Sequence, residues 1–597
     1  MKSMLNTPRM SMVFAPLALC VSAGLAAPPA VLANVPGDTA LYAVIPDVGA
    51  LLTDFSAMNT ALAGKLPPDA AGIGMGLFFA QSVVSQPGFN TNGSAAILIN
   101  LPEGGMDGAE DPTFTIILPI EDLEAFATGP FMAGQGTTFD GGAATLNMGG
   151  PDSLHMIDIG DFTVASDDKG AISGFKAGEF MASHVSALGA SGERAVSGGD
   201  MVLVANIAQM GGMIDEMMAN AEQQANFMAM MGGGDQVTEG FGAFKELMKS
   251  VQEDGSVGML SLDAGGDGVS LDMGVSFKEG TESAAMFADA SETGSLLNAL
   301  PRDNFLVAYA MDSSAKGTED IVQKIAGMFA KEDGADMGFG AMYTNSSGTS
   351  GMIGASPAAL GGAGLLSKQI TYARADDPSK AVAAMRNSLA SLDGESMMGQ
   401  QYTTSYDAGS AEVAGVKVDT YKISSKADAS GDGGAGSPMG MMMDPAMINS
   451  MLFGMAGGPN GFIAQVDGGY YSTVSKNSEL LSSAISAGKT GEGLGGNEMI
   501  GRVASKLHEG RFGEAYVSLD QLYNTFAPFA QMMGMLDDFQ PLEAMPPIGL
   551  SLVGRDGGMG GRLHMPIDVI GFIAEFSESM NAGGMMGGND GPQDPDF

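Results

Sequence analysis

Short stretches in which apolar and polar residues alternate recur along the chain. Residues Leu260–Asp263 and Val269–Met273 both alternate in this way, and the Gly- and Asp-rich segment 264–268 separates them. A period of two places successive side chains on opposite faces of a strand, and Gly/Asp pairs are typical of tight hairpin turns. The pattern predicts neighbouring antiparallel strands.

Other segments repeat apolar residues at a spacing near 3.6, which predicts amphipathic helices. These helices interrupt the strands without the regular strand-helix-strand alternation of a parallel sheet. The expected fold is therefore α+β, with a mainly antiparallel sheet and packed helices. The predicted helices are Val48–Met58, Ile207–Met231, Thr318–Ala330, Ala381–Leu392, Leu519–Met533 and Ile567–Met580.

Three pairs of similar segments, in the same order along the chain, predict two related halves. The first pair is an apolar strand after a Pro-x-Asp turn. The second is a hairpin turn, a strand and a Ser (Ser166 or Ser475) that can cap the next helix, and the third is a strand leading to Asn206 or Ser518 as an N-cap. Duplication predicts that Phe162 superposes on Tyr471 and Ser166 on Ser475. The pairs are Val35–Val44 with Leu300–Val307, Asp158–Ser166 with Asp467–Ser475, and Val204–Met210 with Tyr516–Leu522.

Composition divides the chain into four parts. We expect a signal peptide over 1–33, a first α+β half over 34–292, a second over 293–582, and a disordered Gly-, Met- and acid-rich tail over 583–597. Gly-rich, apolar-poor segments at 104–111, 232–235 and 428–438 are expected to be linkers.

The N-terminus has the features of a secretory signal peptide. Lys2 and Arg9 precede an apolar run over 12–27 that is too short to span a membrane, and small residues follow it. Cleavage after Ala33 is the first candidate, and cleavage after Ala26 is the second. Cys20 follows Leu19, which does not fit a lipoprotein signal. Export, to the periplasm or beyond the cell, would thus leave a mature chain without cysteine or disulfides.

Charge narrows the range of partners. The 597 residues include 69 Asp and Glu but only 27 Lys and Arg, for a net charge of −42. This balance excludes nucleic acid and anionic membrane surfaces, both of which need basic protein surfaces. Binding of cations or basic partners is one interpretation of the acidic surface. Adaptation to a saline exterior, where salt screens self-repulsion, is the favoured one.

The search for catalytic and metal-binding motifs gives few candidates. The four His (His155, His184, His508 and His564) are scattered and lack the spacing of zinc ligands. Residues 428–433 resemble the start of a calcium loop, but its twelfth position is Met439 instead of Glu. Ser166-x-x-Lys169 and the Lys-Thr-Gly element at 489–491 resemble penicillin-recognising enzymes, whose Ser-Asp-Asn element is missing. No catalytic, cofactor or metal residue is therefore assigned.

Methionine is the most unusual enrichment, with 48 residues. Met443, Met447, Met451 and Met455 recur every four positions, which predicts a stripe along one helix face. Such a stripe is most simply core packing. The alternatives are a pliable apolar surface for a hydrophobic partner, forming a flap over the second half, and a Cu(I) site made of thioether sulfurs.

The opening strand at Val35–Val44, repeated at Leu300–Val307, resembles a family of uncharacterised exported bacterial proteins. These proteins carry a duplicated domain of unknown function that begins with a Leu/Val-Pro-x-Asp-Thr strand. The second copy departs from the pattern, with Asn304 in the place of Thr39. The resemblance implies export and an α+β repeat, and it brings no catalytic residues.

Together these features favour an exported, acidic, non-catalytic protein that binds a partner or has a structural role at or outside the cell envelope. The alternatives are a carrier of a hydrophobic ligand or a Met-rich Cu(I)-binding protein, and third an enzyme with an unrecognised site. A wide apolar cavity between sheet and helices would favour the carrier, converging sulfurs would favour copper, and convergent carboxylates in a cleft would favour an enzyme.

Overall fold

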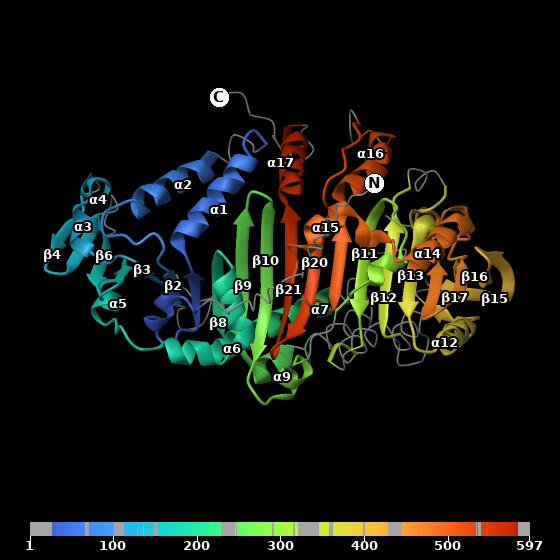
Figure 1. Cartoon of the computed structure of the whole chain (residues 1–597), viewed down its shortest axis with the longest axis horizontal. Coiled ribbons are helices and arrows are strands. Elements are labelled where there is room, and N and C mark those ends of the chain that lie inside the picture. The colour runs from blue at the N-terminus through green and yellow to red at the C-terminus, as the bar shows by residue number, and fades with distance from the viewer. Residues whose placement is uncertain are drawn as a thin grey trace, which may run out of the picture.

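The described residues form one antiparallel sheet of 21 strands with helices packed on it (Figure 1). The structure is a computed structural model that describes residues 27–65, 71–100, 113–134, 136–147, 153–228, 245, 248–288, 292–314, 317–319, 346–356, 362–397, 400–427, 445–532, 534 and 539–582. The predicted α+β class with a mainly antiparallel sheet is confirmed, because every pairing between named strands is antiparallel.

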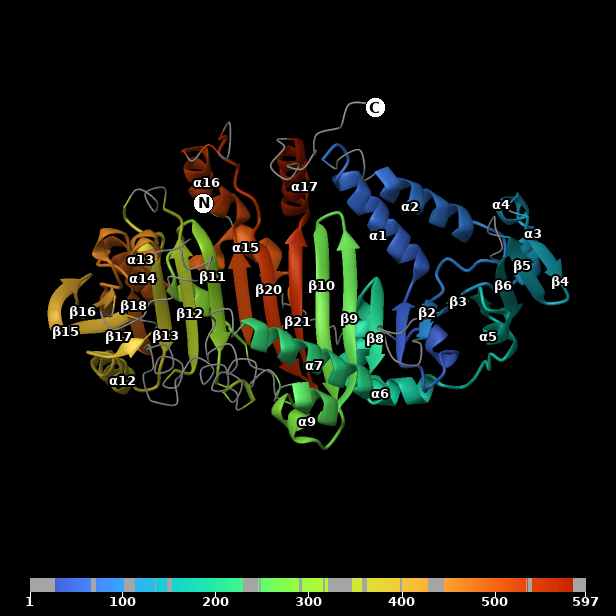
Figure 2. The same cartoon turned by 180° about the vertical axis from the view of Figure 1, so that it is seen from behind.

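The sheet has two arms that meet at its centre, and Figure 2 shows the same arrangement from behind. From its outer edge inward, the first arm is β4 (Thr138–Asp140), β5 (Ala143–Asn147), β6 (Ser153–Asp158), β7 (Thr163–Ser166), β3 (Thr113–Leu118), β2 (Ala95–Asn100), β1 (Leu41–Ile45), β8 (Met201–Asn206), β9 (Gly255–Gly265) and β10 (Gly268–Phe277).

The second arm continues from β10 without a break. From the centre outward it is β21 (Gly558–Pro566), β20 (Ile548–Arg555), β19 (Gly513–Val517), β11 (Phe305–Asp312), β12 (Gly348–Gly354), β13 (Gln369–Arg374), β18 (Gly469–Thr473), β17 (Phe462–Val466), β16 (Val416–Ala427), β15 (Gln400–Val413) and β14 (Ser396–Met397). We call the β10–β21 pairing the seam.

Helices surround the sheet, and several match the sequence prediction closely. The predicted hairpin at 264–268 is also confirmed, with Gly265 opposite Gly268. The α-helices are α1 (Val48–Ala61), α2 (Ala71–Val84), α3 (Leu123–Thr128), α4 (Pro130–Gly134), α5 (Lys169–Ser173), α6 (Met181–Gly198), α7 (Gly211–Met228), α9 (Glu282–Met286), α12 (Pro378–Ser391), α13 (Pro445–Phe453), α14 (Ser478–Thr490), α15 (Glu498–Ala504), α16 (Leu519–Met532) and α17 (Ile567–Ala582). Short 3-10 helices are η1 (Ala30–Ala33), η5 (Leu296–Ala299), η7 (Leu365–Lys368), η8 (Gly454–Ala456) and η9 (Leu494–Gly496).

Three of the residues predicted as helix N-caps do not cap the helices that follow them. Asp168, instead of Ser166, caps α5, and Asn477, instead of Ser475, caps α14. The Ser166 hydroxyl instead donates 2.9 Å to the carbonyl of Phe114 on the neighbouring strand, so it secures β7 to β3. Asn206 begins a turn, and α7 starts only at Gly211. Ser518 does stand directly before α16.

Other predictions fall on residues that the structure does not describe. These are positions 1–26 of the signal peptide, the three linkers, the tail, and the predicted helix 318–330 beyond Glu319. Within the described ranges, no helix is long and apolar enough to cross a membrane.

Two large cores lie on one face of the sheet. In the first arm α6 packs on this face, with Leu188 and Val196 among the buried residues beside Met259 of β9. In the second arm α15 packs there, with Val503 buried beside Tyr516 of β19. We call this the covered face, and the buried polar groups of the seam lie on it.

Two smaller cores lie near the outer ends of the arms. The first-arm end is filled by α3, α4 and aromatic side chains around Phe126. The second-arm end is built by α12, whose Met385 and Leu389 are buried against Tyr421 and Ile463. Between them, on the face opposite the covered one, apolar side chains of the central strands are partly open, and Met273 is 54 % exposed.

Candidate functional site

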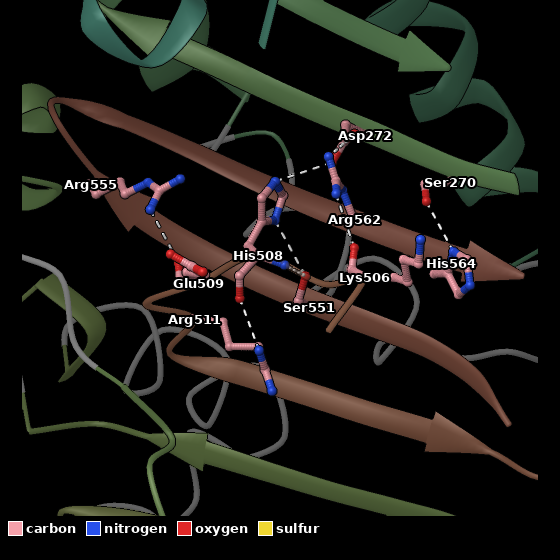
Figure 3. A network of polar contacts seen from close by, with 10 residues as sticks. All are labelled: Ser270, Asp272, Lys506, His508, Glu509, Arg511, Ser551, Arg555, Arg562 and His564. Carbon is pink, nitrogen blue, oxygen red and sulfur yellow. Dashed lines mark hydrogen bonds and ion pairs between the residues drawn. The ribbon is translucent and has the colours of Figure 1, made fainter. Parts of the chain in front are cut away.

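A group of polar side chains lies on the seam (Figure 3). Asp272 of β10 stands directly opposite Arg562 of β21 in the strand register. The guanidinium donates from Nε to Oδ1 at 2.6 Å and from Nη2 to Oδ2 at 2.8 Å, a two-pronged ion pair. Burial would raise the pKa of Asp272, but hydrogen bonds from His508 and Arg562 outweigh it and hold the pKa below its usual value. The carboxylate is therefore ionised at neutral pH.

His508 connects this ion pair to a serine, as Figure 3 shows. Its Nε2 lies 3.1 Å from Asp272 Oδ1, and its Nδ1 lies 3.3 Å from the Ser551 hydroxyl. The Ser-His-Asp order suggests a nucleophilic triad. However, Ser551 is 0 % exposed, so no substrate can reach its oxygen, and Arg562 already neutralises the aspartate. The chain of contacts holds β10, β21 and the segment after α15 together.

A second buried carboxylate lies nearby on β19. Glu514 accepts hydrogen bonds from the hydroxyls of Thr293 at 2.9 Å and Tyr516 at 2.7 Å. Arg511 Nε donates to it at 2.7 Å. Burial, and then the charge of Glu514, raise the pKa of Tyr516, so the phenol stays protonated and remains a donor. This group is fully paired and is structural.

Three carboxylates gather where α1 meets the first arm. Asp200 precedes β8, and its Oδ2 accepts from the N–H of Ala264 at 2.7 Å. Burial raises the pKa of Asp200 to about 6, and the charges of Asp263 and Asp54 add to this. The described residues contain no group of three or more His, Cys, Asp or Glu that could hold a metal ion.

The other sequence candidates do not come together. His155 lies beside Thr145 in β5, while His184 of α6 lies 3.0 Å from the Tyr42 hydroxyl in the first-arm core. Ser166 is buried in the first arm, whereas Lys489 and its neighbours end α14 in the second. The two elements that resemble penicillin-recognising enzymes therefore do not meet in one site. Residues 428–433 lie outside the described part of the chain.

The methionine stripe is shorter than predicted. Helix α13 ends at Phe453, so Met455 belongs to the 3-10 turn η8. Met455 is 96 % exposed and Met451 is 43 % exposed. Met443 and the side chain of Met447 are outside the described residues. The two described side chains face solvent, and neither is core packing.

An apolar cavity of about 290 Å³ lies beneath α13, between it, α12 and the sheet. Its walls combine aliphatic and aromatic side chains with a few neutral polar ones. No charged residue occurs among the lining residues, all of which are described. We call it the apolar cavity; its walls include Tyr309, Leu366, Met385, Leu389, Leu392, Tyr402, Tyr421, Ile423, Phe453 and Val474, with Gln369, Thr371, Ser425, Asn449 and Ser472 as polar members.

The polar members sit at defined places in this cavity. Tyr421 donates its hydroxyl to the carbonyl of Thr473 at 2.9 Å, so its ring is held in place. Asn449 of α13 donates to the Ser425 hydroxyl of β16 at 3.3 Å. An apolar hollow with a few fixed polar groups is the usual design of a site for a small molecule. Sequence reasoning missed it because its walls come from segments far apart in the chain.

A larger groove of about 980 Å³ lies in the first arm. Its lining mixes both charges, Asp38 and Lys176, with the rings of Phe175 and Phe180. A lining with both charges and aromatic rings does not indicate one class of ligand, so we assign no ligand to this groove.

Comparisons with known proteins add no relative. Neither a family model, nor a curated protein, nor a solved structure matches the chain. The resemblance to exported proteins of unknown function therefore rests on its two short segments alone.

We expect Arg562→Leu to destabilise the protein by about 1.5–3 kcal/mol, because it leaves the half-buried carboxylate of Asp272 without its charged partner. The double variant Asp272→Leu/Arg562→Leu should recover part of this loss, since no unpaired charge remains. Urea unfolding of the three proteins measures both effects. Arg194→Leu is the control: its ion pair with Asp556 is exposed, so the expected loss is under about 1 kcal/mol. Equal losses for Arg194→Leu and Arg562→Leu would contradict the role of the seam pair.

We expect the contribution of Asp200 to stability to fall as pH rises from about 4 to about 6, because its pKa is raised from 3.8 to about 6 in the folded chain. A raised pKa means that the folded state holds the proton more tightly, so this contribution is present below the unfolded pKa and is lost as pH rises through the folded pKa. Asp200→Asn cannot ionise, so its melting temperature should fall less, or rise more, than that of the wild type between about pH 4 and pH 6. Parallel curves would refute this, and Asp161→Asn, on an exposed turn, is the control.

Proposed function

We propose that this protein is a non-catalytic binding protein and that the apolar cavity of the second arm takes a small, uncharged, largely apolar molecule. The observation that carries the proposal is the lining of that cavity, which joins aliphatic and aromatic side chains with no charged group. Moving an ion into such a place without a partner is costly. The ligand is therefore neutral, with at most one or two hydrogen-bonding groups.

The shape of the site supports a ligand of modest size. A volume of about 290 Å³ is at the lower end of the range for small-molecule pockets, which begins near ~300 Å³. Tyr421, Met385 and Leu389 make the floor and one wall, and all three are less than 10 % exposed, so the site is largely preformed. A polar group on the ligand can reach the hydroxyls of Thr371 and Ser472 on adjacent strands.

Helix α13 forms the other wall and fits the predicted role of an apolar flap. It supplies Asn449 and Phe453 to the cavity. The turn after it is anchored by close backbone contact: a Cβ at Gly364 would lie 2.4 Å from the backbone nitrogen of Gly454.

The copper alternative gains no support from the described methionines. Cu(I) binding needs several sulfurs converging on one ion. Met385 lines the cavity, while Met451 and Met455 face solvent. We therefore propose an apolar ligand and not a copper ion. The enzyme alternative also lacks support, because the described carboxylates of the seam are paired with basic groups and do not face a cleft.

We also propose that the two arms are duplicates. Their strand orders correspond one to one from β10 and β21 out to β4 and β15, and Asp272 and Arg562 hold matching places beside each other. Met259 and Gly549 lie the same number of residues before them and pair with Val204 and Tyr516. That match agrees with the third pair of segments in the sequence.

The strand register nevertheless gives a different alignment for the second pair of segments. Following partners outward from Val204 leads through Tyr42, Leu98 and Thr115 to Ser166. The same path from Tyr516 leads to Thr473. Ser166 thus corresponds to Thr473 instead of Ser475. The shift of two residues keeps the same face of the strand, which explains why the pattern looked continuous in the sequence.

Export is part of the proposal, with a revised cleavage site. Val31 and Leu32 are both 0 % exposed in the first-arm core, and the N–H of Val31 donates to the Ser94 hydroxyl at 2.9 Å. Cleavage after Ala33 would remove both side chains from the core, at about 1.5–3 kcal/mol each. The burial favours cleavage after Ala26, the second candidate of the sequence. The exported protein then binds its ligand at or outside the cell envelope.

We expect the neutral dye N-phenyl-1-naphthylamine to bind the full-length mature protein with a rise in fluorescence. A neutral probe is needed because the chain carries a charge of −42. Ser472→Leu adds an apolar side chain inside the cavity and should weaken dye binding at least about tenfold. Ser391→Leu makes the same change on the exposed side of α12 and should leave dye binding unaltered. Equal binding by both variants, with unchanged circular dichroism and melting temperature, would reject the cavity as the site.

We expect the exported protein to begin at Ala27, because η1 then remains in the core. N-terminal sequencing of the protein recovered from outside the cytoplasm measures this. A chain that begins at Asn34 would show that the core forms without Val31 and Leu32, and a chain that keeps Met1 would reject the signal peptide.

A further inference from the structure

A second cavity, of about 350 Å³, opens beside the seam, between α15, the end of β21 and the start of α17. Three basic side chains line it: Arg502 and Lys506 from the region of α15, and His564 from β21. Two acidic side chains, Asp267 and Asp568, complete the charged part of its lining. We call it the cationic cavity.

The charges of this cavity do not cancel. Lys506 pairs with Asp267, and Asp568 pairs with Lys65 at 3.7 Å, so both acidic residues of the wall already have a cation. No described residue forms a hydrogen bond or ion pair with the guanidinium of Arg502, which is exposed. Within the described part of the chain, this positive charge of the wall therefore has no negative partner.

The rest of the wall is apolar or neutral. Val503, Ile567, Pro546 and Pro566 line it with Ser505. His564 is 4 % exposed, and its Nδ1 lies 3.0 Å from the Ser270 hydroxyl, which fixes the ring. Burial lowers the pKa of His564, and the charges of Lys506 and Arg562 add to this while Asp267 opposes it, so the ring is neutral at pH 7. It is a hydrogen-bonding group there and not a third full charge.

We infer that the cationic cavity binds a small carboxylate that carries a short aliphatic tail. The Arg502 guanidinium offers two parallel N–H donors, which match the two oxygens of a carboxylate. Lys506, which is already paired with Asp267, adds N–H donors to the same wall. The tail lies against Val503 and Ile567, where its burial contributes about 0.8 kcal/mol per methylene group. This is a different ligand class and a different place from the neutral ligand of the apolar cavity.

Arg502 also has a simpler structural role, which an experiment must distinguish from carboxylate binding. It stands in the last turn of α15, where a positive side chain interacts favourably with the helix dipole. Lys489 stands in the last turn of α14 and, like Arg502, is exposed. Lys489→Gln and Arg502→Gln therefore make the same charge change at two helix ends, and only the second lies in the cationic cavity.

The test is calorimetric titration of the full mature protein with hexanoate, hexanol and inorganic phosphate. The inference predicts saturable binding of hexanoate that Arg502→Gln weakens about tenfold and Lys489→Gln leaves unchanged. It also predicts weaker binding of hexanol, which lacks the charge, and of phosphate, which lacks the tail. Ser472→Leu should not change hexanoate binding, so failure of the apolar cavity and failure of this site are distinguishable.

Four results would overturn the inference. They are no saturable binding of hexanoate at millimolar concentration, equal weakening by Arg502→Gln and Lys489→Gln, hexanol binding as tight as hexanoate, and phosphate binding as tight as hexanoate. The last result would assign a site for compact anions instead of carboxylates. Melting temperatures of both variants within about 2 °C of the wild type show that the fold is intact.

Discussion

The pairing of β10 with β21 is the constraint on which the rest of the structure depends. It joins segments almost 300 residues apart into one sheet, and its centre is the half-buried pair Asp272–Arg562. An ion pair removed from solvent adds little net stability, but it penalises any register in which either charge lacks its partner. A slip of one residue would also turn every side chain to the wrong face. The pair, with His508 beside it, thus fixes how the two arms meet.

The two arms share a strand order but differ in what fills the space around it. At the outer end of the first arm, aromatic side chains around Phe126 close the core. At the outer end of the second, α12 and α13 stand off the sheet and leave the apolar cavity. Under the duplication that we propose, the outer end of one copy is packed as a support and the outer end of the other leaves room for the proposed site.

Local features were predictable from the sequence, and contacts between distant segments were not. Hydrophobic spacing located α1, α12, α16 and α17 to within a few residues, and the Gly/Asp turn located the β9–β10 hairpin. The prediction that Ser166 is an N-cap was wrong, because its hydroxyl donates to a carbonyl of the neighbouring strand β3. The linear sequence does not show that contact. Alternation in β10 also did not tell which face is buried: Asp272 lies inward and Met273 outward. The lining of the apolar cavity comes from seven separate stretches of the chain, so no local pattern could reveal it.

The central claim is that the second arm carries a neutral apolar ligand in nature. Native purification of the protein, followed by solvent extraction and mass spectrometry of the extract, tests it most directly. The account predicts one uncharged compound in near-stoichiometric amount from the wild type and its absence from Ser472→Leu prepared in the same way. A wild-type extract without such a compound, or the same compound in equal amount from Ser472→Leu, would contradict the claim.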